Sequence, residues 1–265
     1  MVFRSPGAIA LQIGPLSIRW YGVLIALAVL VGTSLAQREA RRKGLDAEPL
    51  MNALVLGIVC ALVGARLYYV AFNWDYYAGN LTKIAAVWEG GLAIHGGLLG
   101  GLLGGGAYAL RRRLPVARYL DICAPSLILG QAIGRWGNFF NQEAFGTPTT
   151  LPWRLYIDPA HRPPALAQFE FFHPTFLYES LWNLAVFALL VGFLRRPMER
   201  SPGALFLAYL GLYSAGRFFI EALRIDSLML GPLRAAQVVS VLLVALSAGG
   251  ILYLLRAGRP APRST

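Results

Sequence analysis

The sequence predicts an all-α polytopic membrane protein with seven transmembrane helices. Hydrophobic residues make up 57% of its 265 residues, charged residues make up only 14%, and the mean hydropathy is +0.55. These values do not fit an ordinary soluble domain. The apolar residues also gather into long runs, and prolines stand in the connections between them, for example at Pro115, Pro174 and Pro202. This arrangement indicates membrane spans.

Seven apolar segments are long enough to span a bilayer as helices. A hydrocarbon core about 30 Å thick requires about 20 helical residues. The predicted spans are 17–37, 50–72, 91–110, 119–137, 175–194, 203–222 and 233–255. We therefore expect residues 1–265 to form a single membrane-embedded domain. The connection 138–174 is long and rich in proline and aromatic residues, which predicts a small structured head region.

Basic residues alternate between the two sides of these spans. Fourteen fall on one side: Arg38, Arg41, Arg42, Lys43, Arg111, Arg112, Arg113, Arg118, Arg195, Arg196, Arg200, Arg256, Arg259 and Arg263. Six fall on the other side: Arg4, Lys83, Arg154, Arg162, Arg224 and Arg234. The positive-inside rule makes the first side cytoplasmic, so we predict a periplasmic N-terminus and head region and a cytoplasmic C-terminus. The net charge of +11 thus reflects membrane orientation, and no nucleic-acid partner is expected.

Four basic residues lie inside or at the edge of the predicted spans: Arg19, Arg66, Arg135 and Arg217. A charge at the bilayer centre costs at least about 2.5–3.5 kcal/mol, so such residues are functional candidates by default. The predicted topology places all four toward the outer leaflet. The other unusual polar residues share that leaflet: Tyr21, His95, His173, Glu179 and Glu221. A channel or transporter would more often place polar groups at the midplane.

A glycine-rich segment at 90–106 contains a histidine at the head of the third predicted span. Gly97, Gly101 and Gly105 recur at every fourth residue, with Gly96, Gly100 and Gly104 beside them, which favours close packing of another helix. His95 could be a merely packed polar group. Its ordinary pKa near 6.5 also suits proton abstraction, and the neighbouring glycines leave room for a ligand.

Two further segments carry arginines suited to an anion. Arg135 and Asn138 share a helix face at 134–146, and a guanidinium group can bind two phosphate oxygens at once, although an arginine that only extends to lipid headgroups is the alternative. Tyr213, Arg217 and Glu221 form one stripe of the sixth span. There the alternative is a structural Arg217–Glu221 ion pair.

Several other classes of enzyme have no support. No GxSxG, HExxH or Walker motif occurs, and the only aspartate in a predicted span, Asp121, lies next to the cytoplasmic surface. Serine hydrolase, zinc protease, nucleotide-dependent and aspartyl protease functions are therefore not indicated. Cys60 and Cys123 lack metal-binding spacing and are expected to be small buried hydrophobic residues.

In this order, the motifs resemble the prolipoprotein diacylglyceryl transferase family over nearly the whole chain. The matching segments are RWYG at 19–22, GGLAIHGGLLGG at 90–101, GRWGNFFNQEAFG at 134–146, HPTFLYE at 173–179 and RFFIEALRIDS at 217–227. The segment GRWGNFFN is the most specific of these. Phe176 departs from the family pattern, which usually has glutamine there, so the resemblance does not imply a polar contact at this position.

The resemblance implies transfer of a diacylglyceryl group from phosphatidylglycerol to the lipobox cysteine of a preprolipoprotein, with release of glycerol phosphate. It implies catalytic roles for His95, Arg135, Arg217, Tyr21 and Glu143. The expected substrate-binding residues are Arg135, Asn138, Arg217, Glu221, Gly146 and Tyr213. No metal or organic cofactor is needed. The expected protein is a monomer in the bacterial plasma (inner) membrane, with its active site toward the periplasmic leaflet.

One alternative comes from another class: a phospholipid flippase or transporter would share the anion-binding arginines. Such a protein should also carry polar residues through both leaflets and usually internal repeats, and the sequence has neither. Which of His95, Tyr21 and Glu143 acts as the general base stays open at the level of the sequence.

Overall fold

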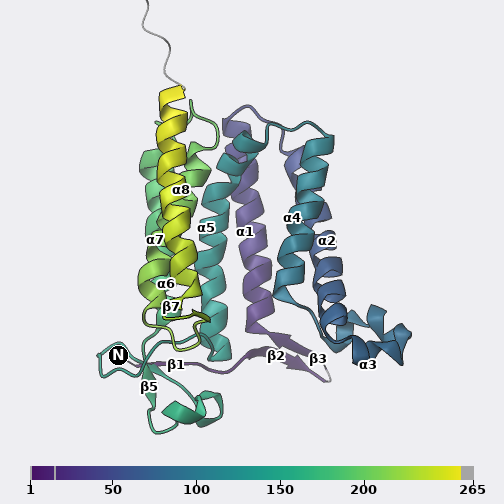
Figure 1. The fold of residues 1–265 in the computed structure, drawn as a ribbon, viewed down its shortest axis with the longest axis vertical. Coiled ribbons are helices and arrows are strands. Elements are labelled where there is room, and N and C mark those ends of the chain that lie inside the picture. Colours follow the sequence, from purple (N-terminus) through teal and green to yellow (C-terminus); the bar gives the residue numbers. More distant parts are fainter. Residues whose placement is uncertain (1, 15, 258–265) are drawn as a thin grey trace, which may run out of the picture. The chain divides into compact units, whose positions relative to one another are not determined.

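Helices dominate the computed structural model, which describes residues 2–14 and 16–257 (Figure 1). The long helical segments of this part of the chain are α1 (Trp20–Arg42), α2 (Glu48–Phe72), α4 (Ile94–Arg111), α5 (Val116–Asn141), α6 (Thr175–Leu189) with its π-helical continuation η5 (Leu190–Leu194), α7 (Ala204–Glu221) and α8 (Ala235–Ala257). Each overlaps one predicted span. The predicted ends differ from the observed ones by up to five residues, since the polar ends of several helices continue past the apolar run.

Four of these segments are long and apolar enough to cross a membrane, counting only the described residues: α1, α2, α6 with η5, and α8. Helix α4 is rich in glycine, whereas α5 and α7 carry charged residues. The helices thus indicate a membrane protein, and the seven-span topology stays a prediction. Arg259 and Arg263, which the sequence places in the cytoplasmic cluster, lie outside the described residues.

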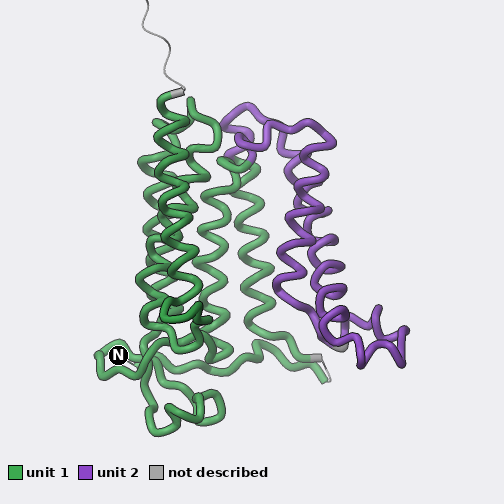
Figure 2. Tube along the Cα trace, in the orientation of Figure 1, with its two compact units in different colours: residues 1–38, 120–265 green, residues 39–119 purple. Residues whose placement is uncertain are grey.

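The chain divides into two compact units, residues 1–38 with 120–265 (unit 1) and residues 39–119 (unit 2) (Figure 2). In unit 2, α2 and α4 pack closely through glycine. A Cβ atom added at Gly96 would overlap the Gly64 carbonyl oxygen, and one at Gly100 would overlap the Cys60 carbonyl oxygen. The close helix packing that the glycine-rich sequence predicts is therefore confirmed. The glycines of α4 that lie closest to α2 are Gly96, Gly100 and Gly104.

Unit 1 has a hydrophobic core between α5, α6 and α7. The buried side chains of this core are Ala124, Ile128, Val186, Leu190, Leu205, Ala208 and Tyr209. At one end of the core, buried Asp121 of α5 accepts hydrogen bonds from the backbone N–H groups of Gly203 (2.8 Å) and Phe206 (2.9 Å). These N–H groups begin α7 and have no partner within the helix, so the aspartate caps it and fixes it against α5.

Small strands and a second core lie at the opposite end of α5. Strand β1 (Phe3–Arg4) is parallel to β4 (Leu155–Tyr156), which is antiparallel to β5 (Phe171–Phe172). The short helices η3 (Pro159–His161) and η4 (Pro164–Leu166) lie in the connection between β4 and β5. An aromatic core supports the sheet: Phe139, Phe145, Leu155, Ile157, Phe172 and Phe176. Residues 142–174 are thus held by a core that they share with the end of α5 and the start of α6.

The remaining elements lie at helix ends. Hairpin β2 (Ile9–Ile13) and β3 (Leu16–Arg19) leads into α1. In unit 2, α3 (Trp74–Ala78), η1 (Leu81–Ala85) and η2 (Val87–Glu89) connect α2 to α4. Hairpin β6 (Met229–Leu230) and β7 (Leu233–Arg234) connects α7 to α8.

Candidate functional site

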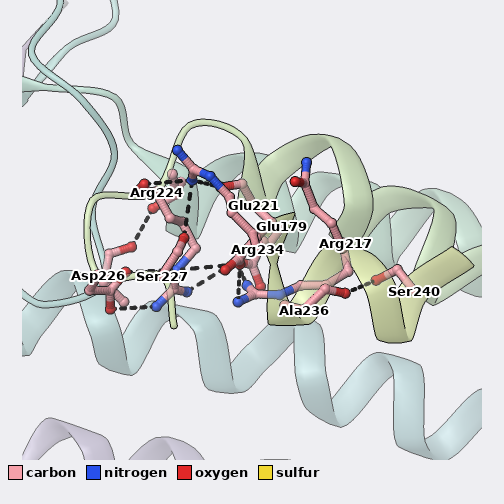
Figure 3. Close-up of polar contacts among 12 residues, drawn as sticks. Glu179, Arg217, Glu221, Arg224, Asp226, Ser227, Arg234, Ala236 and Ser240 are labelled. Atoms are coloured by element: carbon pink, nitrogen blue, oxygen red, sulfur yellow. Dashed lines mark hydrogen bonds and ion pairs between the residues drawn. The ribbon is translucent and has the colours of Figure 1, made fainter. Parts of the chain in front are cut away.

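Three arginines and two glutamates meet at one end of unit 1. Arg135 lies in the last two turns of α5, and Glu179 lies near the start of α6. Arg217 and Glu221 are one turn apart at the end of α7, and Arg224 follows that helix directly (Figure 3). Since the last turns of α5 and α7 lie beside the first turns of α6, their charged side chains converge. We call these five residues the arginine site.

Glu179 is the residue that joins the arginine site together. Its Oε2 atom lies 2.5 Å from Nε of Arg135, and its Oε1 atom accepts a hydrogen bond from Nη1 of Arg217 at 2.8 Å. The same Oε1 lies 3.5 Å from Nη1 of Arg224. Glu221 pairs with Nη2 of Arg217 at 2.5 Å and lies 3.9 Å from Nε of Arg224.

Both glutamates are removed from solvent. The side chains of Glu179 and Glu221 are 4% and 3% exposed, while those of Arg135 and Arg217 are 22% and 18% exposed. A buried carboxylate is tolerated when cations and hydrogen bonds pair with it. Three guanidinium groups face two carboxylates here, so the arginine site keeps one formal positive charge. Its exposed side is cationic and attracts an anion.

Arg135 has donors available for such an anion. In the part of the chain that the structure describes, its guanidinium group contacts Glu179 through Nε, and its two Nη groups have no recorded partner. These two groups present parallel N–H donors, the geometry that binds two oxygens of a phosphate. Arg135 is therefore positioned by Glu179 and open to a ligand. This contact differs from simple extension to lipid headgroups, the alternative at the level of the sequence.

A second layer holds Arg224 in place. Asp226 accepts hydrogen bonds from Nε and Nη2 of Arg224 at 2.9 and 2.6 Å. Burial alone would lower the pKa of Arg224, but Asp226, Glu179 and Glu221 together raise it above its ordinary value, so this residue remains a cation. Nη1 of Arg234 donates to the carbonyl oxygens of Glu221 and Arg224 and to Oγ of Ser227 (Figure 3). Arg234 thus fixes the turn after α7.

Tyr21, in α1, lies beside α5, the helix that carries Arg135. A Cβ atom added at Gly137 would overlap the Tyr21 ring, so the absence of a side chain at Gly137 lets the ring lie against the helix. Directly after Gly137, Asn138 donates to Oε1 of Glu143 at 2.9 Å, and Asn141 donates to the same oxygen at 3.4 Å. The structure thus joins Asn138 and Glu143, which the sequence places in one motif.

Gly146 and Tyr213 occupy packed positions. Gly146 is buried, its backbone pairs with that of Arg224, and an added Cβ would lie 2.7 Å from Cβ of His173. Tyr213 stacks on Tyr209 with ring centroids 6.3 Å apart and packs against the core of unit 1. Both residues are placed where they support the segments that carry Arg217 and Arg224, and their substrate-binding roles stay predictions.

Phe176, which departs from the family pattern, is part of the aromatic core. Its side chain is buried, and its ring centroid lies 4.9 Å from that of Phe139 and 5.3 Å from that of Trp136. The position is filled by apolar packing from α5 and α6. A polar residue is therefore not required here to position Glu179, which lies one turn further along α6.

His95 and Arg66 belong to unit 2. His95 is exposed in the first turn of α4, with its ring centroid 6.2 Å from that of Tyr68, and its role beside the arginines stays a prediction. Arg66, a functional candidate from its place in an apolar helix, is 5% exposed and donates to four carbonyl oxygens. These belong to Ile84, Gly90, Gly91 and Lys83, at 2.5–3.1 Å. Arg66 therefore fixes the connection between α2 and α4.

The site residues predicted from the sequence omit Glu179 and Arg224. Both stand in the matched motifs, and a carboxylate near the start of an apolar helix is itself a signal. Its partners, however, come from α5 and α7 and could not be assigned from spacing along one helix. Among the described residues, no group of three or more His, Cys, Asp or Glu side chains could hold a metal ion.

The fold indicates a helical membrane protein, and the arginine site has one more guanidinium group than carboxylates, a composition that suits a negatively charged ligand. The sequence profile of prolipoprotein diacylglyceryl transferase matches residues 8–253. Similar proteins named phosphatidylglycerol–prolipoprotein diacylglyceryl transferase occur in Thermosynechococcus vestitus (52% identity, 98% of this chain, 97% of that protein), Trichormus variabilis (52%, 98% and 94%) and Synechocystis (50%, 97% and 93%). The chain therefore belongs to the prolipoprotein diacylglyceryl transferase family. The names of these relatives agree with the transferase interpretation and not with the flippase alternative.

Proposed function

We propose that this chain transfers the diacylglyceryl group of phosphatidylglycerol to the thiol of a preprolipoprotein lipobox cysteine. The observation that carries the proposal is the contact of Arg135 with buried Glu179 through Nε, which leaves its two Nη groups without a partner among the described residues. Arg217 contacts the other oxygen of the same glutamate. This arrangement suits a lipid phosphodiester. The name of these relatives, phosphatidylglycerol–prolipoprotein diacylglyceryl transferase, supplies the substrate classes.

In the proposed reaction, the cysteine thiolate attacks the glyceryl carbon that bears the phosphate ester. The carbon–sulfur bond forms as the carbon–oxygen bond breaks, and the electron pair of the broken bond stays on the phosphate oxygen. Glycerol phosphate leaves with this added negative charge. Arg135 and Arg217 would stabilise that charge through donors that are already oriented. The reaction needs only side chains of the chain itself.

A general base would remove the thiol proton. A free thiol has a pKa of about 8.5 and is only a few per cent thiolate at pH 7, so a base could contribute about 100- to 10,000-fold. His95 is the proposed base, with Tyr21 and Glu143 as the alternatives. Tyr21 contacts the helix of Arg135, and Glu143 accepts hydrogen bonds from Asn138, which supports a place for both near the substrate.

We further propose a monomer with seven spans in the bacterial plasma membrane, a periplasmic head region at 138–174 and an active site toward the periplasmic leaflet. The alternation of basic residues supports this topology. Single cysteines introduced at Asn80 and Thr150 should react with an impermeant reagent in intact cells. Labelling of both only after permeabilisation would reverse the proposed orientation.

The direct test of the function is incubation of the purified protein with phosphatidylglycerol and a lipobox peptide. We expect a thioether-linked diacylglyceryl peptide and an equal amount of glycerol phosphate. A peptide with serine in place of the cysteine is the matched control and should give neither product. Lipid movement across vesicles without thioether formation would instead support a transporter.

The role of His95 is tested by comparing His95→Gln with Arg135→Gln. A variant that lacks the base should still bind phosphatidylglycerol and should recover rate when the assay pH exceeds the thiol pKa. A variant that lacks the phosphate contact should bind the lipid poorly at every pH. If His95→Gln binds as poorly as Arg135→Gln and does not recover, His95 is a binding residue.

A further inference from the structure

Glu179 is the only described residue that contacts all three arginines of the arginine site. Arg135 comes from α5, Arg217 from α7 and Arg224 from the segment after α7, so these three side chains share no helix. Without a common partner, three cations at the ends of different elements would repel each other. Glu179 is therefore the common partner that holds the three guanidinium groups together, with Glu221 and Asp226 as further partners of Arg217 and Arg224.

Glu179 also determines the net charge of the arginine site. With both glutamates ionised, the three arginines retain one unbalanced positive charge. The outer pair does not change this balance, because Arg234 and Asp226 carry opposite charges. Glu179 is 4% exposed, so water screens its charge weakly, whereas Asp226 is 48% exposed.

We propose that Glu179 is a positioning residue that fits the arginine site to a singly charged phosphodiester and disfavours a doubly charged phosphomonoester. This inference rests on the proposed function, because it concerns the phosphate site of the same reaction. One unbalanced positive charge pairs with one negative charge. The arginines stabilise the partial charge that develops while the carbon–oxygen bond breaks. A second full negative charge on a bound ligand would have no unbalanced cation in the site and would lie near the Glu179 and Glu221 carboxylates.

The charge match has a consequence for turnover. The lipid donor is a phosphodiester with one negative charge. The released glycerol phosphate is a monoester that carries about −1.5 to −2 at pH 7, since the second pKa of such phosphates is near 6. A site with one excess positive charge holds the donor without retaining the product. Glu179 therefore favours release of glycerol phosphate after each transfer.

The experiment compares two soluble competitors for the site at pH 8. Glycerol phosphate is the dianionic monoester, and glycerophosphoglycerol is the monoanionic diester with the same headgroup. Each displaces a fluorescent short-chain phosphatidylglycerol from the purified full-length protein, and the ratio of their two inhibition constants is the readout. The variants are Glu179→Gln, which adds one positive charge, and Asp226→Asn, which adds the same charge at an exposed position.

We expect Glu179→Gln to shift the ratio at least about tenfold toward glycerol phosphate, because a nearby, weakly screened charge is removed. Asp226→Asn should shift it less than about twofold, because solvent screens that carboxylate. Equal shifts in both variants would show that only bulk charge matters. No shift in a folded Glu179→Gln protein, with folding checked by its melting temperature, would also overturn the inference.

Glu179→Asp separates charge from position. The aspartate keeps the negative charge but is shorter by one methylene group. Its carboxylate therefore lies further from Nε of Arg135 and Nη1 of Arg217, which are 2.5 and 2.8 Å from the Glu179 carboxylate. The inhibition ratio should stay within about twofold of wild type while thioether formation falls at least about tenfold. Wild-type turnover in this variant would refute the positioning role, even if Glu179→Gln failed to fold.

The two proposals fail differently in these assays. If the ratios change as expected but no variant and no wild-type protein forms thioether, the phosphate site stands and the transferase proposal fails. If the wild-type protein forms thioether and the Glu179→Gln ratio is unchanged, the transferase stands and the role of Glu179 fails.

Discussion

Arg66 in unit 2 and Arg135 in unit 1 are both arginines in largely apolar helices, but their partners differ in kind. All three nitrogens of Arg66 donate to backbone carbonyl oxygens, and Gly91 packs so closely that an added Cβ would lie 2.7 Å from Nη1. Arg135 instead contacts a carboxylate through one nitrogen, Nε. The donors of Arg66 are all bonded to the backbone, whereas Arg135 keeps two nitrogen groups available for a ligand.

This difference shows why an intramembrane arginine is not by itself evidence of a binding site. Carbonyl oxygens satisfy the donors of Arg66 and add no charge of their own, so the side chain serves to close the connection between α2 and α4. Glu179 and Glu221 are shared among several arginines, so the guanidinium groups of Arg135 and Arg217 are oriented but not saturated. The number and type of acceptors separate the two roles.

The largest expected effect is that of Arg135→Lys. A lysine ammonium is a point charge and cannot contact Glu179 at Nε and two phosphate oxygens together, so turnover should fall by about 100-fold or more. The measurement is thioether formation by purified protein, with the melting temperature as control for folding. Near wild-type turnover would remove Arg135 from the phosphate site and make it resemble Arg66.

Arg217→Lys should cost about tenfold or more in turnover, because Arg217 bridges Glu179 and Glu221 and is proposed to contact the phosphate. Glu221→Gln tests the opposite possibility that Arg217 serves only this pair. If the pair is purely structural, both substitutions should lower the melting temperature alike and leave the Michaelis constant for phosphatidylglycerol unchanged.

Arg66→Lys should affect stability and not chemistry. The lysine ammonium has three donors and should keep some of the four hydrogen bonds, so a net loss of one or two should cost about 2–4 kcal/mol, since bonds to charged donors contribute about 1.5–3 kcal/mol each. The melting temperature should fall on the order of 5–10 °C, and residues 73–91 should become more sensitive to protease. Turnover per folded molecule should change less than about threefold. A large loss of turnover at unchanged stability would contradict the structural role.

A pair of glycine substitutions sharpens the same contrast. Gly137→Ala should displace the Tyr21 ring and lower turnover about three- to tenfold with little loss of stability, because a small misplacement near the reacting groups is costly. Gly91→Ala should instead lower the melting temperature, because Gly91 has φ +74° and its added Cβ would press on Arg66 and Tyr69. If Gly137→Ala lowered mainly the melting temperature and Gly91→Ala mainly turnover, the contrast between Arg135 and Arg66 would be wrong.

The smallest effect concerns His173, whose backbone pairs with Gly146 and Thr147 beside Arg224. Burial lowers the pKa of His173 below its ordinary value of 6.5, so the folded protein binds fewer protons than the unfolded chain. Stability should therefore fall as pH decreases through 6.5 toward the lowered pKa. His173→Gln should reduce the difference in melting temperature between pH 7.5 and pH 5.5 by about 1–2 °C. An unchanged difference would exclude His173 as its source.

Much of the fold follows from local sequence. Apolar runs and proline-containing connections predict the seven long helical segments of the described residues. The Arg217–Glu221 ion pair, which the spacing of these residues allows as an alternative, is observed at 2.5 Å. The glycine row of α4 predicts close helix packing, which α2 provides. These features depend on residues within one element, where helix periodicity determines which side chains are neighbours.

The sequence by itself therefore determined the helices, the family and the arginines that carry the proposed function. Only the tertiary structure decided that Glu179 joins Arg135 to Arg217 and that Arg66 is bound by carbonyl oxygens of a later connection. The physical reason is that a buried guanidinium group must find acceptors wherever folding brings them. Those acceptors come from other elements of the chain, so no periodicity within the arginine's own helix identifies them.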